Sequence, residues 1–75
     1  MNLDGIKNSD IALAIDEYIH DSKDRLILKF KLIDGLTHME ISDRLYAEGI
    51  QLSERQVKTR FYRAERKLFE YWKLT

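Results

Sequence analysis

The sequence predicts an all-α fold, a small four-helix bundle. Its 75 residues include no proline and only three glycines, so few positions oppose a helical backbone. Apolar residues recur at intervals of three and four rather than two, which is the period of a helix face and not of a strand. We expect a single domain, residues 1–75, with a small core, because folding buries only about 60% of the surface of so short a chain.

The first predicted helix begins at Asn8 or Ser9 and ends at about His20. Either residue is a suitable N-terminal cap, because a short polar side chain can accept a hydrogen bond from a free backbone amide. The apolar residues on one stripe of this helix are Ile11, Ile15, Tyr18 and Ile19. That stripe is expected to face the core.

The second predicted helix runs from about Ser22 to Asp34, and Gly35 follows it as a residue that tolerates a left-handed backbone. Its predicted core stripe comprises Ile27, Phe30 and Ile33. The leucines that extend this apolar surface around the helix are Leu26, Leu28 and Leu32. They indicate either burial on two sides of the bundle or a docking surface for another protein.

The third predicted helix begins at a capping box, in which the side chains of Thr37 and Glu40 each bind the other residue's backbone amide. Gly49 is expected to end this helix, and Ser53 to cap the next one. The apolar residues expected to face the core from the helix and the connection after it are Ile41, Leu45, Ile50 and Leu52.

The fourth predicted helix is the longest and runs from about Glu54 to Leu74. Its core stripe steps by four, three, four and three residues. The stripe comprises Val57, Phe61, Ala64, Leu68 and Tyr71 or Trp72. The two aromatic residues are expected in the core, although stacking on a nucleic-acid base or on a partner protein is the alternative.

The charge of the chain is distributed unevenly. The formal net charge is zero, which by itself argues against a nucleic-acid partner. Residues 1–37 carry five basic and seven acidic side chains, however, whereas residues 53–68 carry six basic and two acidic ones. The positive charge is therefore concentrated on the first two thirds of the fourth helix.

The side of the fourth helix opposite its core stripe is predicted to bind DNA. Arg55, Lys58 and Thr59 lie in its first turns, where side chains can reach base edges in the major groove. Farther along, the residues expected to hold phosphates are Tyr62, Arg63, Arg66 and Lys67. The plainer alternative is a solvated charged face, in which Glu54 and Lys58 form a helical ion pair.

A short capped helix, a turn and a longer capped helix with a basic outer face make a helix-turn-helix, here about residues 37–74. Residues 24–68 also resemble region four of bacterial sigma factors, and similar domains occur in small phage regulators. The matching segments are Leu32-Ile33-Asp34-Gly35-Leu36-Thr37, Glu40-Ile41-Ser42, Val57-Lys58-Thr59-Arg60 and Arg63-Ala64-Glu65-Arg66-Lys67-Leu68. The resemblance implies promoter binding through Arg55, Lys58 and Thr59, and contact with RNA polymerase.

The chain departs from that family in one place. Twelve positions separate Leu45 from Val57, more than the family usually has, so the stretch Tyr46–Gln51 is longer. An extra turn of the third helix, ending at Gly49, would absorb this insertion. Promoter preference therefore does not carry over. The sigma-factor regions that melt DNA and grip the polymerase core are also missing from these 75 residues.

Other functions find little support in the sequence. His20 and His38 stand alone without metal-ligand spacing, and both are expected to be exposed near helix ends. No catalytic constellation or cofactor motif can be assembled, so we expect neither an enzyme nor a bound cofactor. The absence of cysteine, of a membrane span and of a signal peptide at Met1–Ser9 predicts a cytoplasmic protein.

The sequence thus predicts a sequence-specific regulator of transcription that binds double-stranded DNA. The resemblance implies that it comes from a phage or mobile element. A single helix-turn-helix makes a small interface, so we expect a homodimer or a monomer tethered to RNA polymerase. One alternative is a protein-interaction module that docks on polymerase or another regulator through Leu28, Leu32 and the aromatic C-terminal segment. Another is the DNA-recognition domain of a packaging or recombination complex.

Overall fold

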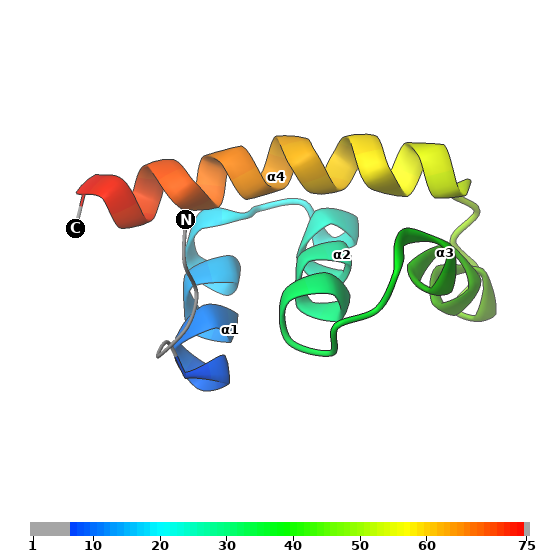
Figure 1. The fold of residues 1–75 in the computed structure, drawn as a ribbon, viewed down its shortest axis with the longest axis horizontal. Helices are drawn as coiled ribbons and strands as arrows, with labels where there is room; N and C mark the ends of the chain where they lie inside the picture. The colour runs from blue at the N-terminus through cyan, green and yellow to red at the C-terminus, as the bar shows by residue number, and fades with distance from the viewer. Residues whose placement is uncertain (1–6, 75) are drawn as a thin grey trace.

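The computed structural model describes residues 7–74, and this part of the chain contains four helices and no strand (Figure 1). The helices are α1 (Asn8–Tyr18), α2 (Ser22–Leu32), α3 (His38–Ala47) and α4 (Glu54–Leu74). Helix α4 runs along one side of the molecule, and the three shorter helices all pack against it. Helix α3 lies beneath the start of α4 and α1 beneath its C-terminal part (Figure 1). The predicted all-α class and helix order are confirmed.

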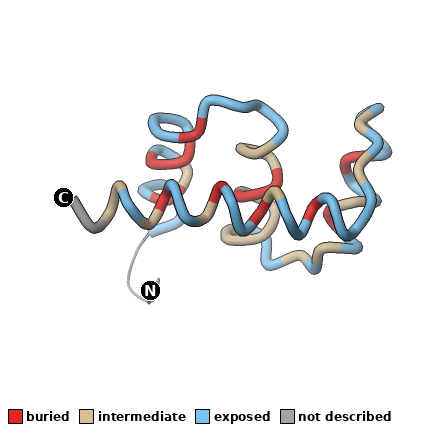
Figure 2. Tube along the Cα trace, turned by 90° about the horizontal axis from the view of Figure 1, so that it is seen from above, coloured by how far each residue is buried: buried red, intermediate tan, exposed pale blue. Residues whose placement is uncertain are grey.

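The core lies between α4 and the three shorter helices. Along α4, buried positions alternate with exposed ones in a helical repeat (Figure 2). The buried residues of α4 are Val57, Phe61, Ala64 and Leu68, and Tyr71 and Trp72 are half-buried against the same core. The predicted stripe of this helix is therefore confirmed, and the core interpretation of the two aromatic residues is confirmed with it.

Helix α1 differs from the prediction at both ends. Asn8 is already helical, and the residue before it, Lys7, makes no side-chain capping bond, so neither Asn8 nor Ser9 is the cap. The helix ends at Tyr18 rather than His20. Tyr18 is 41% exposed because it lies at the edge of the bundle, where its ring stacks on that of Tyr71 with centroids 3.4 Å apart. Residues 1–6, which belong to the segment Met1–Ser9 where no signal peptide is expected, lie outside the described residues.

Helix α2 is capped by Asp21, whose carboxylate accepts hydrogen bonds from the amides of Lys23 and Asp24. The helix ends at Leu32, two residues before the predicted end at Asp34. Gly35, with φ of +70°, turns the chain so that the amide of Leu36 returns to the carbonyl of a residue in the last turn of α2. A left-handed residue cannot continue a helix, and glycine adopts it without strain.

The leucines around α2 are mainly part of the core. Leu28 is fully buried, and Leu26 and Leu32 are half-buried against the same cluster. Ile27 is fully buried as well, whereas Phe30 and Ile33, at the other end of the predicted stripe, are half-buried. Burial is therefore the correct interpretation for Leu28. The docking surface that the sequence suggested through Leu28 and Leu32 cannot include Leu28.

Helix α3 begins at its predicted capping box, and Gly49 terminates it as predicted, although its last helical residue is Ala47. Thr37 Oγ1 accepts from the amide of Glu40, and the Glu40 carboxylate accepts from the amide of Thr37, which completes the capping box. At the other end Gly49 adopts φ of +83°, and the amides of Gly49 and Ile50 donate to the carbonyls of Tyr46 and Leu45. This pair of bonds satisfies carbonyls that the end of the helix would leave free.

An extra turn of α3 does not absorb the whole insertion, contrary to the prediction, and most of the inserted residues lie in the connection between α3 and α4. Tyr46 and Ala47 belong to α3, but the remaining residues of the stretch Tyr46–Gln51 lie outside the helix. Ile50 and Leu52 pack against the core from this connection. Ser42 in α3 also donates a hydrogen bond to the carbonyl of Leu52 at 2.6 Å, which ties the connection to the helix before it.

No helix in the described part of the chain combines the length and apolar character needed to cross a membrane.

Candidate nucleic-acid interface

A second capping box fixes where α4 begins. The Ser53 hydroxyl accepts from the amide of Gln56 at 3.2 Å, and the Gln56 side chain accepts from the amide of Ser53 at 2.9 Å. Two backbone amides at the start of the helix are thereby satisfied. Because α4 starts at Glu54, Arg55 lies in its first turn and Lys58 and Thr59 in its second.

The exposed residues predicted to bind DNA share one side of α4. We call this side the outer face; it comprises Arg55, Thr59, Tyr62, Arg63 and Arg66, and all five side chains are exposed. The face is turned away from the three shorter helices, because the buried stripe of the same helix points toward them (Figures 1 and 2). Lys58 and Lys67 are also exposed and lie on its two flanks.

The contacts of Thr59 limit what it can offer a base. Its hydroxyl donates a hydrogen bond to the carbonyl of Arg55, one turn earlier, at 3.0 Å. The hydroxyl proton is therefore used within the helix, while the methyl group and the oxygen lone pairs stay free. A methyl group on this face suits contact with the methyl group of thymine, which lies in the major groove.

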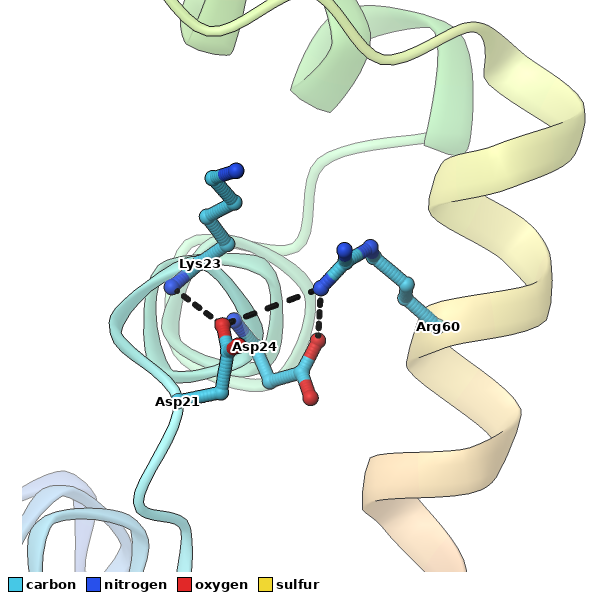
Figure 3. Close-up of polar contacts among 4 residues, drawn as sticks. All are labelled: Asp21, Lys23, Asp24 and Arg60. Atoms are coloured by element: carbon cyan, nitrogen blue, oxygen red, sulfur yellow. Dashed lines mark hydrogen bonds and ion pairs between the residues drawn. The ribbon is translucent and has the colours of Figure 1, made fainter.

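Arg60 is a basic residue in the first turns of α4 that binds the start of another helix. Its guanidinium lies 3.1 Å from a carboxylate oxygen of Asp24 and 3.7 Å from one of Asp21, both at the start of α2 (Figure 3). The Asp24 side chain is only 15% exposed. The pair joins α2 to α4, so Arg60 contributes less positive charge to the surface than its sequence position suggests.

The same carboxylates shape one flank of α4. A shallow groove separates the start of α2 from the outer face, and Asp21 and Asp24 line its far side. On the near side it is lined by Arg55, Gln56, Thr59, Arg60, Arg63 and Lys67. The amides of Asp24 and Lys23 and the charge of Arg60 hold the pKa of Asp21 below its usual range, so this carboxylate stays negative. The two carboxylates therefore oppose an anion on the α2 side of the groove, whereas Arg55, Arg63 and Lys67 attract one on the α4 side.

The opposite flank of α4 faces α3, and His38 of α3 packs against it. The imidazole packs against Phe61 and Tyr62, with ring centroids 5.7 and 6.1 Å away. Its Nε2 atom is buried and has no hydrogen-bond partner among the described residues. The prediction that His38 is exposed is wrong: the residue is half-buried, because its side chain turns from the start of α3 toward α4.

Burial is also the main reason that the pKa of His38 lies below its ordinary value of 6.5. The positive charges of Lys31 and Lys58 lower this pKa further, and Glu54 raises it slightly. Lys31 belongs to α2, far in sequence from the basic segment, so the sequence did not indicate it as a site residue. Only the packing of α2, α3 and α4 brings these groups together.

The chain was compared with families, with curated proteins and with solved structures. No family model, curated protein or solved structure matches it. The likeness to region four of sigma factors therefore rests on the sequence segments alone. Within the described residues, moreover, no group of three or more His, Cys, Asp or Glu side chains is placed to hold a metal ion.

Proposed function

We propose that the protein binds double-stranded DNA in a sequence-specific manner and regulates transcription, with the start of α4 in the major groove. The observation that carries the proposal is the outer face of α4. There Arg55, Thr59, Tyr62, Arg63 and Arg66 are all exposed on the side of the helix opposite the core. The major groove admits one α-helix, and arginine is the side chain that most often reads guanine there.

The support for this proposal is structural as well as electrostatic. Helix α3 ends in a defined turn and α4 starts at a defined cap, so the base-reading residues sit on a rigid element. The shorter helices cover only the inner side of α4 (Figure 1). A duplex can therefore approach the outer face without rearrangement of the core.

The mode of binding we propose resembles that of region four of sigma factors, with the second helix of the motif in the groove. The connection before α4 is longer here, because most of the stretch Tyr46–Gln51 lies outside α3. The target sequence is therefore expected to be the protein's own rather than a sigma-type promoter element. One such motif makes a small interface, and a second copy or RNA polymerase would supply the remaining affinity.

Selection from a pool of random DNA duplexes at near-physiological salt, followed by sequencing, tests this function. The parent chain is expected to enrich one motif, and Arg55→Glu to lose it. The matched control is Lys7→Glu, which changes the charge equally on an exposed residue just before α1, at the end of that helix away from α4 (Figure 1). The control should enrich the same motif as the parent.

Two results would count against the proposal. If the parent enriches nothing at any salt concentration, the chain does not read DNA sequence on its own. If Arg55→Glu and Lys7→Glu enrich the parental motif equally well, the protein reads DNA through a surface other than the outer face of α4.

A further inference from the structure

We propose that Lys31, His38 and Lys58 form a binding site for one phosphate of the DNA backbone, on the flank of α4 that faces α3. The three side chains come from three different helices, α2, α3 and α4. The proposal rests on the proposed function, since it assumes that a duplex lies along α4. It also narrows the base-reading residues to Arg55 and Thr59, because Lys58 becomes a phosphate contact.

The position of His38 defines the site. Its ring packs against Phe61 and Tyr62, which lie three and four residues after Lys58 on α4. Residues at this spacing share one side of a helix, so the Lys58 side chain starts next to the imidazole. The ammonium groups of Lys31 and Lys58 are both close enough to His38 to disfavour a third positive charge there. Both lysines therefore lie within electrostatic range of the imidazole.

The two lysines of this area are not held in ion pairs. Neither Lys31 nor Lys58 forms an ion pair among the described residues, where the paired cations are Lys29 and Arg60. Two carboxylates act on these groups: that of Glu54 raises the pKa of His38 slightly, and that of Glu40, bound in the capping box of α3, has its pKa lowered in part by Lys31. A phosphate group carries the negative charge and the acceptor oxygens that such a pair of ammonium groups lacks.

The two flanks of α4 therefore differ. On the far flank, Asp21 and Asp24 line the groove and pair with Arg60, while Arg63 and Lys67 line the same groove with no ion pair among the described residues. The flank beside α3 presents Lys31 and Lys58. A helix in the major groove has a phosphate strand on each side. The site beside α3 is expected to hold one of these two strands.

The salt dependence of DNA binding tests the site. In Lys31→Gln, one phosphate contact is lost, so the slope of log affinity against log salt should fall by about one, and binding at about 0.15 M salt should weaken about fivefold for every sequence. Lys31→Arg keeps the charge and should keep the slope. Lys7→Gln removes one charge at a remote exposed position and should also leave the slope unchanged.

The pH dependence tests the part played by His38. A phosphate beside the imidazole favours its protonated form, against Lys31, Lys58 and burial, so binding should take up a proton. The affinity of the parent should therefore rise as the pH falls from about 7.5 to about 6, and His38→Gln should lack this rise. Thermal melts of each variant establish that it is folded before its affinity is compared.

The outcomes separate the site from the function. If the parent binds DNA and Lys31→Gln keeps the parental slope, the phosphate site is wrong while the proposed function stands. If the parent and His38→Gln share one pH dependence, His38 does not belong to the site. If the parent binds no duplex even at low salt, the proposed function fails, and this site fails with it.

Discussion

At the scale of single residues, the proposed function divides the outer face of α4 into side chains expected to read bases and side chains expected to hold phosphates. Arg55 lies in the first turn of α4, beside Thr59, to which its own carbonyl is bonded. Arg55→Ala should cost about 1–3 kcal/mol of binding free energy on the selected sequence and much less on unrelated DNA. Arg66→Ala should instead weaken all sequences alike and flatten the salt dependence. Titrations of both variants at several salt concentrations, on specific and unrelated duplexes, distinguish these effects; equal binding by Arg55→Ala and the parent would remove its base-reading role.

His38 gives the free protein a pH-dependent stability. The folded chain holds its pKa below 6.5, chiefly by burial and then through Lys31 and Lys58, so near that pH the unfolded chain binds more protons. The contribution of the neutral His38 side chain to the free energy of unfolding is complete above about pH 7. It is lost as the pH falls toward the lowered pKa of His38. The free energy of unfolding, measured with denaturant from about pH 7.5 to about pH 5, should fall less in His38→Gln than in the parent. Parallel curves would show that His38 titrates alike in both states.

At the scale of elements, helix α3 and helix α4 each begin with a reciprocal capping box, whereas α1 has none. Thr37→Ala and Ser53→Ala should therefore each lower the free energy of unfolding by about 1 kcal/mol. Ser9→Ala is the matched control, because Ser9 lies within α1 and caps nothing, so its effect should be close to zero. Denaturant unfolding of the three variants tests this; an equal loss in all three would mean that the caps do not stabilise the helices.

The helix boundaries show which local signals suffice. Thr37, Gly49 and Ser53 were identified correctly, because capping boxes and left-handed glycines act within a few residues of sequence. The start of α1 was not, since Asn8 and Ser9 both have cap-forming side chains but the helix already includes them. Helix α2 ends before its predicted last residue, because the residues just before Gly35 form the turn toward α3.

At the scale of the whole molecule, one small core joins all four helices. Ile27 is fully buried in it, and Leu13 on α1 is 63% exposed. Ile27→Ala should lower the free energy of unfolding by about 2–5 kcal/mol, because it leaves a cavity at the centre of the bundle. Leu13→Ala should change it by no more than about 0.5 kcal/mol. Chemical denaturation of both variants checks the packing, and similar losses would contradict this placement of the core.

The fold class, the helix order and the core stripe of α4 were all predictable. They depend on the periodic spacing of apolar residues along the sequence, which is strongest in the longest helix. The candidate site was predictable only along α4. The ion pair between Arg60 and Asp24 joins residues that lie 36 positions apart, and Lys31 and His38 reach α4 only through the packing of α2 and α3. No local pattern encodes such contacts, so the unequal flanks of α4 emerge only in three dimensions.

The central claim is that a duplex binds along the outer face of α4. The most direct measurement is a titration of the isotope-labelled protein with a short DNA duplex at low salt, followed by amide chemical shifts in two-dimensional NMR spectra. Shifts and line broadening should concentrate on α4 from Arg55 to Lys67 and on His38, and they should spare the start of α1. Changes confined to α1, or spectra that DNA does not alter, would contradict the claim.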